Sequence, residues 1–270
     1  MEFGQARGVE KEDKSMEVYE FGKENKNKIV LIPGNMMCWK QFEPVIPLLA
    51  QHYHVIAIST DGYDGTGKTV FTTAQDAAEK LETSIKERLD GEIELVFGES
   101  FGSATAGMLF HRQKVNVKSM IMSGPQYMNI GIFSKLLAII VPRNQFRLLK
   151  RIQSVEKLPW MLRLYTRGDD EKLLNQFRYA PNNVSLETLK NCVEESLSLY
   201  KVIDSFTACP DAKVSIWYGE NEPNMKKAIR KLKRAFPGAE THAFAGYGHG
   251  EIMSHPEEMA SCIIDFIENV

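Results

Sequence analysis

The most constraining feature of the sequence is Gly-Glu-Ser-Phe-Gly at positions 98–102. It follows the apolar run 93–97 and precedes the helix-like residues 103–110, so it predicts a strand, a tight turn and a helix. A serine at the apex of such a turn has a strained backbone, and glycines flank it because side chains there would collide with the neighbouring strand or helix. The sequence therefore favours Ser100 as a presented nucleophile over a glycine-rich turn with a capping serine.

The composition is that of a globular chain without a bias toward charged macromolecules. Of 270 residues 43% are apolar, which suffices for one large α/β domain or a core with an insertion. The formal net charge is −2, so nucleic acid is not an expected partner. No stretch reaches the roughly 20 apolar residues of a membrane span, and the first residues are polar. We therefore expect a cytoplasmic protein without stable membrane insertion.

The cysteines do not follow a metal-binding or disulfide pattern. The four cysteines are Cys38, Cys192, Cys209 and Cys262. Their spacing matches neither C-x-x-C nor a Cys/His ligand motif. Reduced thiols are expected, with no metal and no cofactor.

Short apolar runs alternate with segments of helical period, which predicts a mostly parallel sheet with helices on both faces. An edge strand is expected at 16–21, and buried strands are expected at 29–32, 55–58, 93–97, 118–122, 213–217 and 241–244. The expected helices are 39–49, 74–89, 103–110, 225–236 and 259–267.

From about residue 125 to 205 the alternation lapses and helical segments follow one another. We expect an α/β core in two parts, 1–124 and 206–270, with a helical cap inserted at 125–205.

Residues 62–69 match G-x-x-x-x-G-K-[ST], the phosphate-binding loop of nucleotide-binding proteins. Such a loop requires a helix that begins at the Gly-Lys-Thr itself. Here a β-branched run intervenes, and the helical pattern begins after Thr72 or Thr73 as the N-cap. We therefore predict a surface loop and keep nucleotide binding as the less favoured alternative.

A serine nucleophile needs a base and an orienting carboxylate. Of the six histidines, His249 lies in Gly-Tyr-Gly-His-Gly just after the last expected strand, where glycines allow the imidazole to reach the sheet edge. The carboxylate should follow the preceding strand, where Glu220 and Glu222 are both candidates.

The order Ser100, Glu222, His249, with Gly-x-x-acid-Pro and Gly-x-Gly-His, resembles the α/β-hydrolase fold superfamily, in particular its serine carboxylesterases and lipases. The resemblance covers the chain outside the cap, and it favours Glu222 over Glu220 as the acid before Pro223. It also implies an oxyanion hole formed by the backbone amides of Asn35 and Phe101. The family usually has Asp as the acid and His in place of Pro33.

The expected cap holds the apolar run 130–141, which suits either packing on the core or a cleft for an apolar or aromatic acyl group. Residues 143–167 hold seven cations and one anion, which indicates either a solvated face or a site for an anionic substrate or acidic lipid.

The predicted function is a serine hydrolase that cleaves an ester or related acyl bond of a small molecule through an acyl-enzyme. The alternative from another class is a ligand-binding protein of the same fold with slow or no turnover. The oligomeric state is left open.

Overall fold

The computed structural model describes residues 16–125, 131–152, 177, 179–203, 206 and 213–269. Within them, one seven-stranded sheet has the order β1-β3-β2-β4-β5-β6-β7. Its strands are β1 (Glu17–Phe21), β2 (Lys28–Ile32), β3 (His54–Ser59), β4 (Glu92–Glu99), β5 (Asn116–Ser123), β6 (Lys213–Gly219) and β7 (Glu240–Phe244). Only the edge strand β1 is antiparallel, which confirms the predicted α/β class and mostly parallel sheet.

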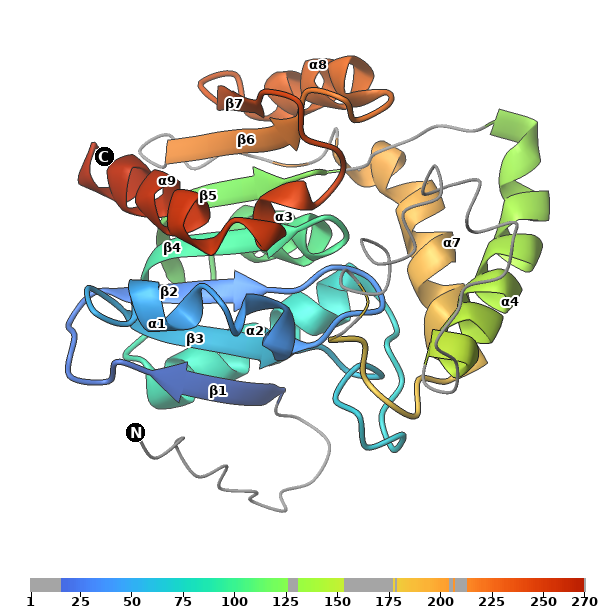
Figure 1. Cartoon of the computed structure of the whole chain (residues 1–270), viewed down its shortest axis with the longest axis horizontal. Helices are drawn as coiled ribbons and strands as arrows, with labels where there is room; N and C mark the ends of the chain where they lie inside the picture. The colour runs from blue at the N-terminus through green and yellow to red at the C-terminus, as the bar shows by residue number, and fades with distance from the viewer. Residues whose placement is uncertain are drawn as a thin grey trace.

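Helices cover both faces of the sheet (Figure 1). The described helices are α1 (Ile46–Leu49), α2 (Ala74–Arg88), α3 (Gly102–Arg112), α4 (Ser134–Ile152), α7 (Leu186–Val202), α8 (Met225–Ala235) and α9 (Pro256–Glu268). Three short 3₁₀ turns are η1 (Trp39–Phe42), η2 (Gly131–Phe133) and η4 (Glu251–Ser254).

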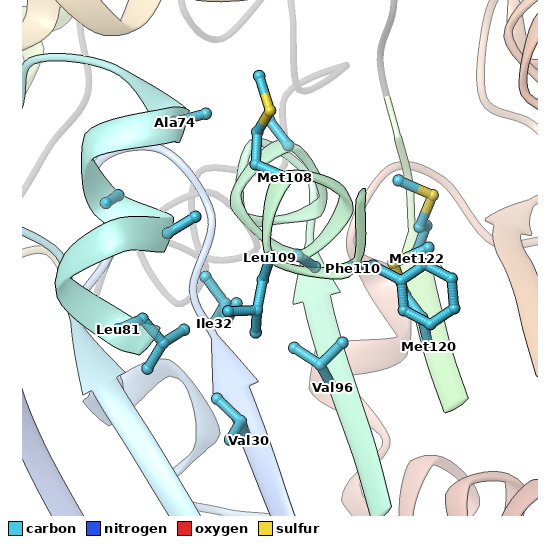
Figure 2. Packing of buried hydrophobic residues seen from close by; sticks show 14 of the residues in the cluster. Val30, Ile32, Ala74, Leu81, Val96, Met108, Leu109, Phe110, Met120 and Met122 are labelled. Carbon is cyan, nitrogen blue, oxygen red and sulfur yellow. The ribbon is translucent and has the colours of Figure 1, made fainter. Parts of the chain in front are cut away.

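The central strands are buried on both faces, as the continuous apolar runs predict. On one face Val30 packs in a cluster with Leu81 of α2 and Leu109 of α3 (Figure 2). On the other face Leu31 packs in a cluster with Ile263 of α9. Alternate residues of each strand therefore enter different clusters, and each fully buried Leu or Ile side chain contributes about 2 kcal/mol of hydrophobic stabilisation.

The single helix expected at 39–49 is wrong, because the structure divides it into η1 and α1. Pro44 lies between the two pieces. Proline has no backbone N–H and its ring collides with the carbonyl four residues earlier, so Pro44 disfavours one continuous helix at this position.

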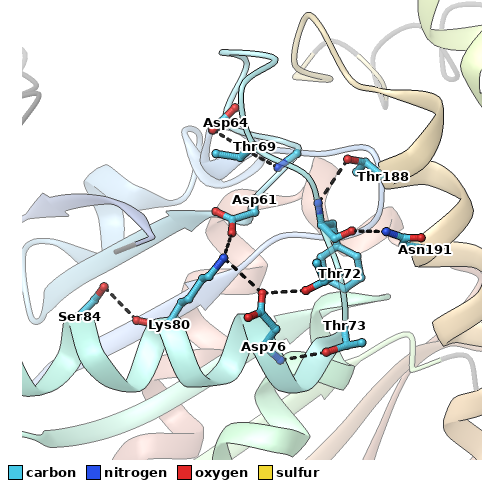
Figure 3. Close-up of polar contacts among 12 residues, drawn as sticks. Asp61, Asp64, Thr69, Thr72, Thr73, Asp76, Lys80, Ser84, Thr188 and Asn191 are labelled. Carbon is cyan, nitrogen blue, oxygen red and sulfur yellow. Dashed lines mark hydrogen bonds and ion pairs between the residues drawn. The ribbon is translucent and has the colours of Figure 1, made fainter. Parts of the chain in front are cut away.

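Residues 62–69 form an internally bonded loop rather than the start of a helix (Figure 3). The hydroxyl of Thr69 donates to Asp64 Oδ2 at 2.7 Å. Helix α2 begins after Thr73, whose side chain accepts a hydrogen bond from the backbone N–H of Asp76 at 3.0 Å. Of the two predicted N-caps the structure has Thr73, and α2 begins after the Gly-Lys-Thr that would have to hold a phosphate instead of at it.

Helix α7 is tied to the core through the segment before α2 (Figure 3). The hydroxyl of Thr188 accepts a hydrogen bond from Phe71 N (3.3 Å), and Asn191 Nδ2 donates to Phe71 O (2.7 Å). Both α4 and α7 lie beyond the C-terminal ends of the parallel strands, with α7 nearer the sheet (Figure 1). These helices form the inserted helical region between β5 and β6.

The apolar run at the start of α4 is exposed instead of packed on the core. The large exposed side chains are Ile132, Phe133, Leu136, Ile139 and Ile140. Residues 126–130 and 153–176 lie outside the described residues, and with them lie Ile130 and several of the cations expected on the cap. None of the described helices is long and apolar enough to cross a membrane.

Candidate active site

The strand, turn and helix predicted around Ser100 are present, with β4 ending at Glu99 and α3 beginning at Gly102. Ser100 has a φ of 49°, in the left-handed region that non-glycine residues rarely adopt. A Cβ on Gly98 would lie 2.6 Å from the carbonyl oxygen of Gly102, and one on Gly102 would lie 2.5 Å from that of Ile32. Both glycines are therefore required by close backbone contacts, as the sequence predicts.

His249 is brought to Ser100 by the loop after β7. Its Nε2 lies 2.9 Å from Ser100 Oγ. The loop is held by Glu251, which accepts a hydrogen bond from the backbone N–H of Gly248 at 2.7 Å. A Cβ on Gly124, directly after β5, would lie 2.9 Å from the imidazole of His249. A larger residue at this position would therefore collide with the ring.

Glu222, and not Glu220, reaches His249. Glu222 Oε2 lies 2.9 Å from His249 Nδ1, while its Oε1 accepts a hydrogen bond from the backbone N–H of Gly219 at 2.9 Å. The Glu222 side chain is only 1% exposed. Glu220 instead accepts a hydrogen bond from Gly246 N at 3.2 Å. The result is a continuous hydrogen-bonded series from a hydroxyl through an imidazole to a buried carboxylate.

The surroundings of His249 favour its protonated form. Burial by itself lowers the pKa of the imidazole, but the hydrogen bond to Glu222 and the negative charges of Glu99 and Glu222 raise it by more, so the pKa lies above its ordinary value. An imidazole with these partners can accept a proton from Ser100 and hold it as an imidazolium.

Glu99 is a site residue that the sequence analysis missed. It is 2% exposed, and burial raises the pKa of its carboxyl group to about 7. The signal available in the sequence was a carboxylate at the end of an apolar strand, directly before the serine. Nothing in residue type alone showed that it would be buried beside His249.

The predicted oxyanion loop lies beside Ser100. A Cβ on Gly34 would lie 3.4 Å from Ser100 Cβ. The loop is fixed by hydrogen bonds from Gly34 N to Gln41 Oε1 (3.0 Å) and from the Tyr63 hydroxyl to Asn35 Oδ1 (2.5 Å). Gly34 packs against Ser100, and Asn35 is the next residue in the chain. Phe101 directly follows Ser100 and precedes the first residue of α3.

A cavity of about 720 Å³ lies next to the same loop, a volume within the range of small-molecule pockets. Aromatic side chains from both the core and the inserted region contribute to its lining: Tyr19, Trp39, Phe177 and Tyr179. Cys38, which also lines it, donates from Sγ to the carbonyl of Tyr179 at 3.2 Å. Ser100 and His249 do not contribute to its lining, so the cavity is separate from the contacts of the serine hydroxyl.

Metal-ligand clusters of three or more His, Cys, Asp or Glu side chains do not occur among the residues that the structure describes.

Comparison with known proteins agrees with this architecture. The alpha/beta hydrolase family matches residues 29–261. Similar solved structures include an alpha/beta hydrolase family protein from Desulfitobacterium hafniense, with a TM-score of 0.78 and 20% identity over 93% of this chain and 99% of that one. MenH from S. aureus has a TM-score of 0.71 and 16% identity over 95% and 99% of the two chains. A thermophilic esterase from Thermogutta terrifontis has a TM-score of 0.70 and 14% identity over 93% and 92%.

A parallel sheet that presents a serine on the turn between strand and helix, followed by an acid and a histidine on later loops, defines a class of hydrolase folds. The family match spans most of the sequence, and the chain belongs to the alpha/beta hydrolase family. The resemblance to the α/β-hydrolase superfamily stated from the sequence is thereby confirmed. The solved structures, at their low identities, support the fold alone.

Proposed function

We propose that the protein is a serine hydrolase that cleaves a carboxylic ester or a related acyl bond of a small molecule. The observation that carries this proposal is the pair of 2.9 Å contacts that join Ser100 to His249 and His249 to Glu222. Serine is a weak nucleophile at its ordinary pKa, and a base within hydrogen-bond distance is what activates it.

In the proposed acylation step Ser100 Oγ attacks the acyl carbon while His249 Nε2 takes its proton. Glu222 holds Nδ1–H and stabilises the imidazolium that forms. The carbonyl π electrons move to oxygen, and the amides of Asn35 and Phe101 donate hydrogen bonds to this oxyanion. As the carbonyl re-forms, the bond to the leaving group breaks and His249 returns its proton to the leaving oxygen.

Deacylation repeats the sequence with water in place of the serine. His249 takes a proton from water, the hydroxide adds to the acyl carbon, and collapse of the second oxyanion releases the acid and restores Ser100 with its proton. The cycle needs no cofactor or redox partner.

For the substrate class we propose an apolar or aromatic acyl group, and the proposed acyl chemistry agrees with the esterase named among the similar structures. The cavity near the oxyanion loop is lined by aromatic and polar side chains together and does not include Ser100, so it does not by itself identify the substrate. The rival function, ligand binding without turnover, would not require Ser100 to be paired with a base.

Labelling with a fluorophosphonate probe tests the proposal, since only an activated serine is phosphonylated efficiently. We expect stoichiometric labelling, with the adduct located on Ser100 by peptide mass spectrometry, and turnover within a panel of aryl esters and acyl thioesters. Heat-unfolded protein is the control for non-specific reaction. Absence of both labelling and turnover would favour the ligand-binding protein.

A further inference from the structure

The exposed large hydrophobic side chains of the described residues all lie in the turn η2 and the first part of α4. We call this set the α4 patch, and its members with their exposures are Ile132 (88%), Phe133 (61%), Leu136 (55%), Ile139 (54%) and Ile140 (43%). Spacings of three and four residues place those within α4 on one helix face. A contiguous apolar surface of this kind marks an interaction site more often than an isolated exposed leucine does.

The same helix face continues as a row of cations. Arg143, Arg147 and Lys150 follow at the same spacing and are exposed. The 22 residues 131–152 contain five cations and neither Asp nor Glu, whereas the whole chain has a net charge of −2. The positive charge is therefore local to the helix that exposes the apolar side chains.

We propose that the α4 patch docks on an anionic lipid surface, with its apolar side chains among the lipids and Arg143, Arg147 and Lys150 at the phosphates. Apolar residues joined to cations on one exposed face are typical of helices that bind membrane interfaces. A second copy of the chain fits less well. Parallel pairing of two such helices would oppose cations with cations, and antiparallel pairing would bury cations against apolar side chains.

Docking of this kind would bring the proposed active site toward the lipid. Helix α4 lies at the edge of the molecule beyond the C-terminal ends of the strands (Figure 1), and Ser100 follows the C-terminal end of β4. The docked helix and Ser100 therefore both lie at the C-terminal edge of the sheet.

The test is co-sedimentation with vesicles of phosphatidylcholine alone and with vesicles in which about a third of the lipid is phosphatidylglycerol. Wild-type protein should bind the second and not the first. Each cation near the surface is worth about fivefold in partitioning, so Arg143→Glu with Arg147→Glu should weaken binding by about 25-fold or more. Ile132→Ser with Phe133→Ser should weaken it by about tenfold or more.

The matched control is Lys226→Glu with Arg230→Glu on α8, which makes the same charge change where the apolar face is buried. Equal loss of binding in this control would overturn the proposal, because net charge alone would then explain it. So would absence of binding to the anionic vesicles. Sedimentation of the protein alone also shows whether it self-associates. If it does, and the Ile132→Ser with Phe133→Ser variant does not, the α4 patch is an interface between two copies of the chain instead of a lipid-binding surface. Thermal melting checks that each variant is folded, and none of these measurements depends on catalysis.

A second inference rests on a different observation and on the proposed function. One carboxyl oxygen of Glu99, Oε2, is buried and has no hydrogen-bond partner among the described residues. Glu99 directly precedes Ser100, whose Oγ lies 2.9 Å from His249 Nε2, and a Cβ on Gly34 would contact both Glu99 and Ser100. The groups that influence the charge of Glu99 are Ser123 of β5, His249 of the loop after β7 and Glu222 of the turn after β6. An unpaired buried carboxyl oxygen is costly, and it lies within electrostatic reach of the proposed base.

We infer that Glu99 is a positioning residue that places a second negative charge beside His249 and thereby stabilises its imidazolium. Burial raises the pKa of Glu99 to about 7, so the carboxyl is neutral below that pH and charged above it. The charge is therefore present under mildly alkaline conditions, where an imidazolium on His249 otherwise loses its proton most readily.

The test is the pH profile of Glu99→Gln with Glu220→Gln as the matched control, since both remove one carboxylate near the loop of His249. In Glu99→Gln the pKa of His249 should fall, so the acid limb of kcat/KM should move to lower pH, and kcat at about pH 8 should fall three- to tenfold. The control should keep the wild-type profile. NMR titration of the His249 imidazole reports the same shift without a substrate.

An unchanged His249 titration in Glu99→Gln would overturn the inference, as would a loss of rate that is equal at every pH. A lowered His249 pKa in a protein that hydrolyses no acyl substrate would leave the electrostatic role of Glu99 intact and refute the proposed function instead.

Discussion

Replacement of Ser100 with alanine is expected to lower kcat/KM for a p-nitrophenyl ester by about 10⁴-fold or more, because members of such a triad act as a unit. The side-chain hydrogen bond of Ser100 goes to His249 Nε2 at 2.9 Å, and the turn itself is fixed by backbone contacts of Gly98 and Gly102. Removal of the hydroxyl should therefore leave the fold intact while it removes the nucleophile. Some acceleration over water should persist, since the oxyanion donors remain.

The measurement is steady-state hydrolysis with purified wild type and variant, together with circular dichroism and a thermal melt. Ser198→Ala is the matched control, because it removes a hydroxyl that bonds to the carbonyl of Glu195 on α7, away from the triad. Retention of even a tenth of the wild-type rate in Ser100→Ala would contradict the assignment of the nucleophile, as would fluorophosphonate labelling of this variant.

The parts of the fold that depend on local geometry could be predicted from the sequence. Glycine is the only residue that fits at Gly98 and Gly102, and a turn with such glycines leaves few alternatives for Ser100. The start of α2 could also be predicted, since Thr73 is a favoured N-cap residue and the β-branched run before it forms helices poorly. The same β-branched run made a phosphate-binding loop at 62–69 the less favoured interpretation.

The parts that depend on distant contacts could not be predicted in this way. Glu99 is buried, and the groups that act on its carboxyl, Ser123, Glu222 and His249, come from three elements that are not adjacent to it in sequence. The apolar run at 130–141 suited a buried helix or a cleft equally well, and only the tertiary arrangement shows that five of its large side chains, between Ile132 and Ile140, are exposed. The division of the chain into a two-part core, 1–124 and 206–270, and a cap at 125–205 stays a prediction.

Glu222→Gln is expected to lower kcat/KM by about 10² to 10⁴-fold, and the hydrogen bonds of this side chain give the reason. Oε1 accepts from Gly219 N, a donor that only an oxygen can satisfy. A glutamine would therefore keep its oxygen toward Gly219 and present its NH₂ group to His249 Nδ1. That donor requires an unprotonated Nδ1, so the imidazole would carry its proton on Nε2 and could not accept one from Ser100. The charge that stabilises the imidazolium would be lost as well.

Comparison with Glu220→Gln decides between the two acids, because both variants change one carboxylate to an amide within the same turn. Glu220 accepts from Gly246 N at 3.2 Å and is exposed, so its replacement should cost only severalfold. The pKa of His249 is raised, so both variants are measured at about pH 8, above the ordinary pKa of an imidazole, to favour the unprotonated base in the free enzyme. A larger loss for Glu220→Gln would show that the working acid lies two residues earlier than the geometry indicates. Negligible loss in both would mean that the imidazole is oriented by another carboxylate, and Glu99 would then be the first to replace, since it is the other carboxylate whose charge reaches His249.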